Sequence, residues 1–431
     1  MNSWPSISVI VLNYNGVQHL EPCFQSLAAL NYPSDRLELV CVDNGSTDGS
    51  MALMEEQFPQ VRLVKTGANL GFAGGNNAGA RAARGEFIAF LNNDTRVPPD
   101  WLRILVQPCL EESDVVCAGS KIVSWDGRTL EFGGGALNFA GYGFQQGILC
   151  SEGECYGPPR ETLYACGAGM VVQRDVFLES DGFDEDFFAF YEDSDLGWRL
   201  WVLGHRVMFV PDSKVYHRHH GTAAAVDDWK RRLLYERNAL FSIVKNYDDA
   251  HLDRILPVAL LLLLKRAQHM TGAEAESYRI APERSGSPDY AKEASSPWTL
   301  AHYAREAAHT LVQEGPSGLI TRAQAEVRRR QAPTYPPETI HRPDPTDPAF
   351  EQVPRQAIAH LLAADDLIRY WPRLMEKRAW IQAHRRRSDS EIFRLFGQPL
   401  EPNFFADDYK AAQSILVKAF EIDRIFSRGE E

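Results

Sequence analysis

Ile7-Ser8-Val9-Ile10-Val11-Leu12 is followed at once by the turn-forming residues Asn13-Tyr14-Asn15-Gly16. The first run is almost continuously β-branched, which is typical of a strand buried on both faces of a parallel sheet. Residues 19–30 then carry apolar side chains at helical spacing, which predicts an amphipathic helix. A strand, a polar turn and a helix in this order indicate an α/β fold.

The same order of elements repeats through the first hundred residues. Strands are predicted at 37–42, 61–64 and 87–91, and polar clusters follow them at 43–49, 69–77 and 92–95. Residues 69–77 are expected to form a Gly/Asn loop that precedes a helix at 78–83. Because ligands of open α/β sheets bind at the carboxyl ends of the strands, these clusters are expected to meet at one edge. The sequence therefore predicts a mainly parallel sheet with a ligand site at that edge.

The glycines of Gly71-Phe72-Ala73-Gly74-Gly75 do not form a dinucleotide-binding motif. Their spacing is not G-x-G-x-x-G, and they follow the third predicted strand rather than the first. A nicotinamide-dependent dehydrogenase is therefore disfavoured. Two interpretations stay open at this point: backbone N–H groups that approach a diphosphate, or a plain strand-to-helix turn.

Residues 183–199 crowd aromatic side chains beside a cluster of acids and then enter a helical pattern. Burial next to aromatic rings raises the free energy of ionised carboxylates unless cations compensate. Proteins accept that cost where a carboxylate acts as a base or a ligand, so Glu192 and Asp193 are candidates for an active site. The alternative is an acidic helix N-terminus stabilised by the helix dipole.

A histidine cluster, His217-Arg218-His219-His220, follows a further strand predicted at 206–210. Histidine is the commonest side-chain ligand of metals, and this cluster would lie at a strand end. A surface cluster without a ligand is the alternative, because the spacing matches no particular metal site.

Composition limits the class of protein. The 431 residues suggest about two domains, and a net charge of −13 disfavours nucleic acid as a partner. The seven cysteines form no C-x-x-C pair, which favours the reducing cytoplasm over a disulfide framework. No run of 18 apolar residues is present, so no membrane span is predicted.

The second half of the chain is predicted to be helical. Its apolar run at 255–264 indicates either a buried helix or a helix on a membrane surface. A proline-rich linker is expected within 333–350. Arg328-Arg329-Arg330 and Arg385-Arg386-Arg387 either face phosphates or an anionic membrane surface, or lie on solvated helix faces. The predicted division is 1–245, 246–332, 333–350 and 351–431.

Seven stretches in the first 245 residues closely resemble the motifs of family 2 glycosyltransferases with the GT-A fold. They include Asn13-Tyr14-Asn15-Gly16, Asn92-Asn93-Asp94 and Glu192-Asp193, within residues 8–16, 42–48, 69–77, 91–95, 182–185, 191–196 and 215–217. The order and spacing of the set are specific, whereas no single motif is. The resemblance is strongest to rhamnosyltransferase-type enzymes of bacterial O-antigen or cell-wall assembly. It implies a mixed, mainly parallel sheet flanked by helices, with a helical C-terminal extension outside the shared core.

The resemblance implies an inverting, metal-assisted hexosyltransferase that uses a nucleotide-diphosphate sugar. Tyr14 matches a residue that packs on the donor's base, and Asp43 matches the acid that reads the base edge. Asp94 and His217 match ligands of Mg²⁺ or Mn²⁺, and Asp193 matches the catalytic base, with Glu192 expected to orient the acceptor or the helix start. The implied residues that bind the nucleotide sugar are Asn13, Tyr14, Asp43, Asn69, Asn76, Asn93 and Asp94.

Two features depart from the family pattern. Asn92 stands at the first acidic position of the D-x-D motif, which removes one formal charge at the metal. His219 and His220 follow His217 directly and are further candidates for the same ligand position.

The resemblance also implies the partners. The donor sugar is rhamnose or another hexose, and the acceptor is a glycan hydroxyl, with a polyprenyl-diphosphate-linked glycan as one candidate. The expected location is the cytoplasm, with peripheral association at the inner face of the cell membrane as an option. Two alternative functions are an inactive nucleotide- or sugar-binding module and a nucleotidyltransferase. The second would ordinarily show a glycine-rich, basic phosphate loop after the first strand, and Asn13-Tyr14-Asn15-Gly16 is not one.

Overall fold

A computed structural model describes residues 4–151, 157–218, 227–272 and 353–427. The chain forms two compact units: one comprises Met1–Asp227, Arg378–Glu401 and Phe426–Glu431, and the other comprises Asp228–Lys377 and Pro402–Ile425. The proline-rich linker, the arginines at 328–330, and His219 with His220 lie outside the described residues. The division predicted from the sequence, with its first boundary near residue 245, stays a prediction.

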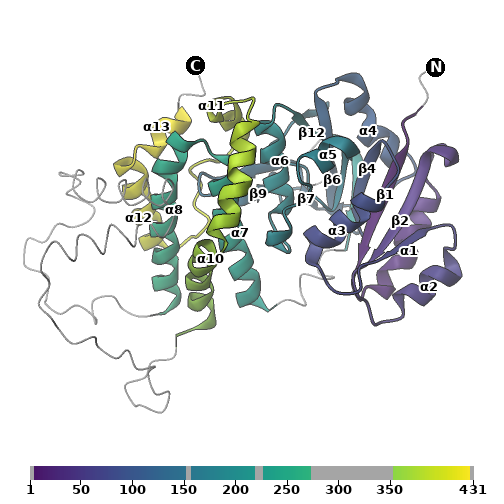
Figure 1. Cartoon of the computed structure of the whole chain (residues 1–431), viewed down its shortest axis with the longest axis horizontal. Helices are drawn as coiled ribbons and strands as arrows, with labels where there is room; N and C mark the ends of the chain where they lie inside the picture. Colours follow the sequence, from purple (N-terminus) through teal and green to yellow (C-terminus); the bar gives the residue numbers. More distant parts are fainter. Residues whose placement is uncertain (1–3, 152–156, 219–226, 273–352, 428–431) are drawn as a thin grey trace, which may run out of the picture. The chain divides into compact units, whose positions relative to one another are not determined.

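The first unit is built on one mixed sheet (Figure 1). Its strand order is β10-β12-β6-β11-β4-β1-β2-β3, and β5 and β7 pair with β12 and β6 at its margin. The pairs β1–β2, β1–β4, β2–β3 and β6–β12 are parallel, whereas β11 runs antiparallel to both of its neighbours. The bounds are β1 Ile7–Asn13, β2 Leu37–Asp43, β3 Arg62–Lys65, β4 Phe87–Asn92, β5 Thr95–Arg96, β6 Val115–Ser124, β7 Leu130–Phe132, β10 Arg160–Glu161, β11 Gly169–Gln173 and β12 Arg206–His217.

The strand register brings the predicted polar clusters to one edge. Asn13, the last residue of β1, pairs with Asp43, the last residue of β2. On the other side of β1, Leu12 pairs with Asn92 at the end of β4. The convergence expected from the strand–turn–helix pattern is therefore present in the structure.

Helices connect these strands, and one of them corrects a prediction. Their bounds are α1 Val17–Ala28, α2 Ser50–Gln57, α3 Gly71–Ala82, α4 Trp101–Glu111, α5 Arg174–Glu179 and α6 Glu192–Val202. The Gly/Asn loop predicted at 69–77 is wrong from Gly71 onward, because α3 begins there. The glycines allow this helix to pack closely on the sheet. A Cβ atom at Gly79 would lie 2.6 Å from Ile10 Cγ2 and 2.8 Å from Val42 Cγ2.

The close approach of α3 to the sheet predicts a loss of stability in the variant Gly79→Ala. The neighbouring Cγ2 atoms belong to fully buried, β-branched side chains that have little freedom to move. Overpacking costs about 1–3 kcal/mol, against a gain of roughly 1 kcal/mol for alanine over glycine in a helix. Urea denaturation should show a free energy of unfolding lowered by up to about 2 kcal/mol. In the double variant Gly79→Ala/Val42→Ala the loss should be smaller than the sum of the single losses, and strict additivity would contradict the packing argument.

Residues 378–401 complete the first unit by packing on its sheet and on α6. Leu137 of β8 (Gly135–Leu137) donates its backbone N–H to the Phe396 carbonyl at 3.0 Å, and β8 pairs with β9 (Gly143–Gln145). The Phe396 ring also meets the buried Trp198 ring edge-on, with centroids 5.2 Å apart. A one-turn helix, α11 (Asp389–Ile392), lies within this segment.

The arginines at 385–387 contact the protein itself. Arg385 forms an ion pair with the buried Asp389 at 2.8 Å. Arg387 donates to the His205 carbonyl at 2.5 Å and lies over the Trp201 ring at 4.8 Å. Two of the three arginines are thus held by the fold, a role that was not among the alternatives considered from the sequence.

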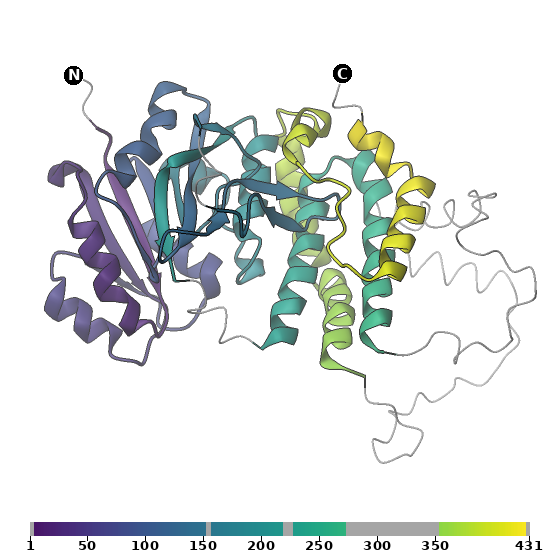
Figure 2. The same cartoon turned by 180° about the vertical axis from the view of Figure 1, so that it is seen from behind.

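The second unit is helical and contains the long apolar run. Figures 1 and 2 both show α7 (Asp228–Asn246), α8 (Asp249–Met270) and α10 (Arg355–Ala383) running side by side. Two shorter helices, α12 (Asp407–Ala419) and α13 (Ile422–Ser427), follow near the C-terminus. Most of the run at 255–264 is buried within α8, although Leu264 is 51% exposed, so the alternative of a buried helix describes it best. Among the described residues, no helix has the length and apolarity that a membrane span needs.

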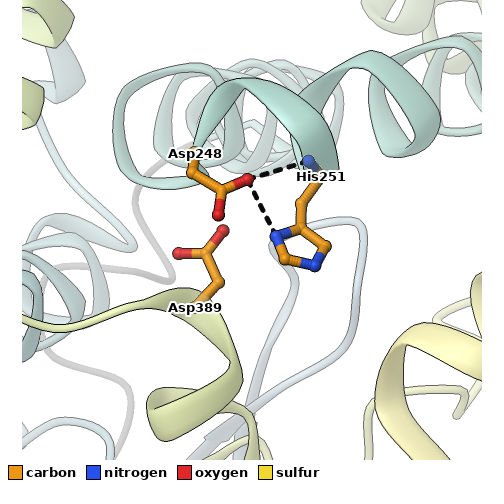
Figure 3. Close-up of side chains that lie close together, drawn as sticks. All are labelled: Asp248, His251 and Asp389. Atoms are coloured by element: carbon orange, nitrogen blue, oxygen red, sulfur yellow. Dashed lines mark hydrogen bonds and ion pairs between the residues drawn. The ribbon is translucent and has the colours of Figure 1, made fainter. Parts of the chain in front are cut away.

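Polar contacts organise the helices of this unit. Asp248 caps α8 by accepting hydrogen bonds from the backbone N–H and Nδ1 of His251, at 2.9 and 2.8 Å (Figure 3). Deeper in the unit, the buried Arg266 pairs with the buried Glu236 at 2.7 Å and donates to the Tyr409 hydroxyl at 2.7 Å. These bonds join α7, α8 and α12 across long sequence separations.

Candidate active site

Asn13, at the end of β1, is the centre of a hydrogen-bond network at the ligand edge of the sheet. Its fully buried side chain accepts from Asn93 Nδ2 at 2.8 Å and donates to Ser46 Oγ at 3.1 Å. Asp43, which is 7% exposed, accepts from the backbone N–H of Ser46 at 3.0 Å. The structure therefore brings together Asn13, Asp43 and Asn93, three of the residues predicted to bind the nucleotide sugar. Ser46, which links Asn13 to Asp43, was not predicted.

Tyr14, the residue after Asn13, is 37% exposed. The turn that carries it is shaped by Asn15, which has a left-handed φ of 49° and accepts from the Thr47 backbone N–H at 2.7 Å. Gly16 must be small, because a Cβ there would lie 2.3 Å from Asn93 Nδ2. An exposed aromatic ring beside a buried carboxylate can stack on a nucleobase while the carboxylate accepts from the base edge.

Asn69 and Asn76 turn their side chains toward the protein. Asn69 Oδ1 accepts from Asn44 Nδ2 at 3.0 Å and from the Gly71 backbone N–H at 2.9 Å. Asn76 is buried in α3 and donates to the Phe72 carbonyl at 3.0 Å. The contacts of Asn69 hold the β3–α3 connection, whereas the bond of Asn76 stays within α3.

A second cluster joins Asp94, which precedes β5, Glu131 in the middle of β7 and His217 at the end of β12. Antiparallel pairing of His217 with Thr95 places His217 Nε2 3.3 Å from Asp94 Oδ1. On its other side, His217 Nδ1 lies 2.8 Å from Glu131 Oε2, contributed by β7. Glu131 was not predicted, because nothing in its local sequence marks it and only the pairing of β7 with β6 brings it here.

The charges of this cluster depend on one another. Burial alone would lower the pKa of the His217 imidazole, but the Asp94 and Glu131 carboxylates that accept its hydrogen bonds raise that pKa to about 9. Burial opposes ionisation of Asp94, yet His217 and the charge of His19 bring its pKa below the ordinary value. If the Nδ1–H of His217 points at Glu131, its Nε2 faces the Asp94 carboxylate. An imidazole nitrogen beside a carboxylate oxygen is a pair of ligands that suits a divalent cation.

Glu192, which is buried, and Asp193, which is half-buried, are neighbours at the start of α6. Asp193 accepts from the backbone N–H groups of Gly167 at 3.0 Å and Ser194 at 2.7 Å. Glu192 is 6% exposed, and its Oε2 has no hydrogen-bond partner among the described residues. A buried oxygen without a partner costs about 1–3 kcal/mol, which a bound hydroxyl could offset.

The two carboxyl groups of this pair differ in acidity. Burial raises both pKa values, and that of Glu192 is raised further by the neighbouring Asp193 carboxylate. The hydrogen bonds from Gly167 and Ser194 limit the rise of the pKa at Asp193. Neighbouring carboxyl groups do not readily ionise together, and the pKa of Glu192 is raised more than that of Asp193, so Asp193 is the first of the two to ionise. One group is thus suited to accept a proton and the other to donate a hydrogen bond.

The turn before this pair has an unusual backbone. Phe188, Phe190 and Tyr191 all have left-handed φ angles, of 64°, 70° and 65°. Phe188 is held against α3, where the Ala73 backbone N–H donates to its carbonyl at 3.2 Å and Gly71 leaves room for it. Bulky residues adopt this conformation only where their surroundings enforce it, and such positions cluster at functional sites.

Asn77 holds the chain shortly before this turn. Its side chain donates to the Phe183 carbonyl at 2.7 Å and accepts from the Phe183 backbone N–H at 3.0 Å. Asn77 closes the motif at 69–77, but nothing in its local sequence distinguishes it from the other asparagines there. It connects the helix that follows β3 to the segment that carries Glu192 and Asp193.

Comparison with known proteins agrees with the motif resemblance. Residues 8–177 match the family described as Glycosyl transferase family 2, which confirms the resemblance inferred from the sequence. Together with the strand order, the match also confirms the GT-A fold.

Two curated relatives show how much of the chain is shared. O-antigen biosynthesis protein RfbC of Myxococcus xanthus is 31% identical over 234 residues, which cover 51% of this chain and 18% of that protein. N-acetylglucosaminyl-diphospho-decaprenol L-rhamnosyltransferase of Mycobacterium tuberculosis is 27% identical over 241 residues, which cover 50% of this chain and 77% of that enzyme. This chain therefore spans less than a fifth of the first relative.

One of the solved structures that this chain matches is that of GalNAc-T7 with UDP, GalNAc and Mn²⁺. It superposes with a TM-score of 0.46 at 16% sequence identity, covering 74% of this chain and 57% of that one.

Proposed function

We propose that this chain, which carries a family 2 glycosyltransferase domain at residues 8–177, transfers a hexose from a nucleotide-diphosphate sugar to a glycan hydroxyl with inversion. The observation that carries the proposal is the arrangement at the sheet edge. Asp43 ends β2, Asp94 and His217 pair beside β5 and β12, and the carboxyl groups of Glu192 and Asp193 begin α6, so different elements of one fold supply the three groups. An inactive binding module would not need the carboxyl pair of Glu192 and Asp193.

The proposed reaction is one displacement. Asp193, in its ionised form, takes the proton of the acceptor hydroxyl as the hydroxyl oxygen forms a bond to the anomeric carbon. The bond from that carbon to the diphosphate oxygen breaks on the opposite face, and its electron pair leaves with the nucleoside diphosphate. Glu192, which keeps its proton, donates a hydrogen bond that orients the acceptor.

Asp94 and His217 are the residues proposed to hold a divalent cation, with Glu131 fixing the imidazole orientation. A bound Mg²⁺ or Mn²⁺ would supply charge neutralisation for the departing diphosphate. The missing carboxylate at Asn92 leaves Glu131 as the second acidic group near Asp94. Asn13 and Asn93 keep the turn after β4 in place through their mutual hydrogen bond.

The proposed biological setting is the synthesis of bacterial surface polysaccharide. Relatives named for O-antigen biosynthesis and for rhamnosyl transfer to a diphospho-decaprenol acceptor support it. Rhamnose is accordingly the first donor sugar to test, and a polyprenyl-diphosphate-linked glycan is the first acceptor. Peripheral association with the cytoplasmic face of the membrane would give access to such an acceptor.

A donor screen tests this function directly. Nucleoside diphosphate released from dTDP-, UDP- and GDP-sugars should be detected for one nucleotide class, and the release should rise when Mn²⁺ is added. Release that requires acceptor, with inverted anomeric configuration in the product, would distinguish transfer from simple hydrolysis. Binding of donor without any release would favour the inactive module, and release of pyrophosphate from a nucleoside triphosphate would favour a nucleotidyltransferase.

The carboxyl pair predicts an acid limb in the pH profile. Only ionised Asp193 accepts a proton, and its pKa is raised above the ordinary aspartate value of 3.8. As the pH falls through that raised pKa, log kcat/KM should fall with a slope of about one per pH unit. Circular dichroism at each pH checks that the fold persists. A rate that stays constant down to pH 3.8 in folded enzyme would contradict the assignment of the base.

A further inference from the structure

Arg218 directly follows β12, which ends at His217, and is an exposed cationic residue beside the proposed binding site of the sugar donor. Its backbone N–H donates to the Asp94 carbonyl at 3.0 Å, which continues the pairing between β5 and β12. The position of Arg218 is therefore tied to the same strand ends that bring Asp94 and His217 together.

A stack of alternating cations and aromatic rings supports this side chain. The Arg218 guanidinium lies 4.2 Å from the centroid of the Trp125 ring. Arg96 lies 4.9 Å from the same ring and 4.2 Å from the Tyr216 ring, and it donates to the Trp125 carbonyl at 3.1 Å. Stacking on rings holds a guanidinium while its N–H edge stays available for hydrogen bonds.

Within the described ranges, this guanidinium has no carboxylate partner, and its contact is the Trp125 ring. By contrast, Arg96 is half-buried between two rings and bonded to a carbonyl. Arg218 is thus the cation of the stack that is free to bind an anion.

His19 supplies a second polar group at this place. It lies in the first turn of α1, one helical turn before Cys23, whose Sγ contacts the Asn92 carbonyl at 3.8 Å. Its Nδ1 is buried and has no hydrogen-bond partner among the described residues. The charges of both Asp94 and Arg218 act on this imidazole, which puts the three side chains in one neighbourhood.

The surrounding charges explain why a cation is needed here. The side chains around the proposed donor site include the carboxylates of Asp43, Asp94 and Glu131. A diphosphate that enters this edge meets like charge unless fixed cations offset it. One divalent ion offsets about two of these negative charges. A guanidinium could offset part of the negative charge that remains on the diphosphate.

We infer that Arg218, held on Trp125, binds the phosphate groups of the nucleotide donor, with His19 as a second contact. The inference rests on the proposed function and adds to it a phosphate-binding residue that lies outside the matched motifs. Charge-assisted hydrogen bonds from guanidinium to phosphate would strengthen as negative charge develops on the leaving diphosphate.

Calorimetric titration of the full chain with UDP, dTDP and GDP in the presence of Mn²⁺ tests the inference. For the diphosphate that binds the wild type, Arg218→Gln should weaken binding roughly tenfold to a hundredfold. Binding of the corresponding nucleoside, which has no phosphate, should not change. Trp125→Ala should weaken diphosphate binding less, and Trp125→Phe should keep it near the wild-type value. Arg128→Gln, at an arginine whose side chain is 86% exposed in the adjoining turn, is the matched control.

The outcomes separate the two proposals. Equal diphosphate affinity in wild type and Arg218→Gln would overturn the inference and leave the proposed function standing. An equal loss of nucleoside and diphosphate binding would also overturn it, because that result indicates a structural role. A wild type that binds none of the three diphosphates would overturn the proposed function together with the inference.

Discussion

Asp193→Asn is expected to lower the turnover of the transferase by about 10²–10⁴-fold, because the amide cannot take the proton of the acceptor hydroxyl. The change keeps the size of the side chain and one acceptor oxygen. The affinity for the nucleotide sugar should stay within a few-fold of the wild-type value. Asp193 lies in α6, whereas Tyr14, directly after β1, and Asp43, at the end of β2, are proposed to bind the nucleobase. Single-turnover transfer and donor titration measure the two quantities separately.

The same carboxylate also holds two backbone N–H groups, so a structural effect must be separated from a chemical one. An asparagine at 193 would direct its NH₂ group at either Gly167 or Ser194. Thermal unfolding of the variant shows whether this matters for the fold. Asp175→Asn, at an aspartate whose side chain is 76% exposed, should leave both turnover and stability unchanged. Wild-type turnover in Asp193→Asn would remove Asp193 from the mechanism.

Asp94→Asn is expected to remove the enhancement of donor binding by Mn²⁺. The carboxylate is the anionic member of the Asp94–His217 pair, and an amide oxygen holds a divalent cation far less strongly. Loss of a group that supports a ligand typically costs 10–100-fold in metal affinity, and loss of the ligand itself should cost at least about a hundredfold. Titration of the donor's nucleoside diphosphate with Mn²⁺, with Mg²⁺ and with EDTA measures the effect.

Two further variants sharpen this test. Glu131→Gln should give an intermediate loss, because Glu131 acts on the cation only through His217. Asp212→Asn replaces an exposed carboxylate on β12, the strand of His217, and should leave the dependence of binding on Mn²⁺ unchanged. Unchanged dependence on Mn²⁺ in Asp94→Asn would mean that the cation, if used, is held elsewhere.

The turn at 188–191 suggests how the proposed catalytic base, Asp193, is held at a fixed position relative to the proposed binding site of the nucleotide sugar. Asn77, on the helix that follows β3, holds the backbone of Phe183, and Gly71 at the start of the same helix leaves space for Phe188. This one helix therefore connects the polar edge of the sheet with the segment that ends in the carboxyl pair. The left-handed conformations of Phe188, Phe190 and Tyr191 are the local cost of that connection.

Local chemistry was enough to predict the sheet, the edge at which its polar clusters meet, and the candidates Glu192, Asp193 and His217, whereas the family resemblance implied the other candidate residues. A β-branched run such as 7–12 can be buried only as a strand of a covered sheet, and the period of the pattern predicted the strands well. It failed at α3, because glycine and asparagine suggest a loop unless a sheet lies close enough to require their small size.

Tertiary structure alone decided which groups act on each other. Glu131 lies 86 residues from His217 in the sequence, and only the pairing of β7 with β6 and of β6 with β12 brings them to 2.8 Å. The support of Arg218 by Trp125 likewise depends on strand pairing. Burial and the distances between charges set the pKa values of His217, Glu192 and Asp193, and both depend on the folded chain. The sequence by itself determined which chemical groups stand at the ends of the strands, because short-range patterns specify strands and turns; their partners were decided by long-range packing, which no local pattern records.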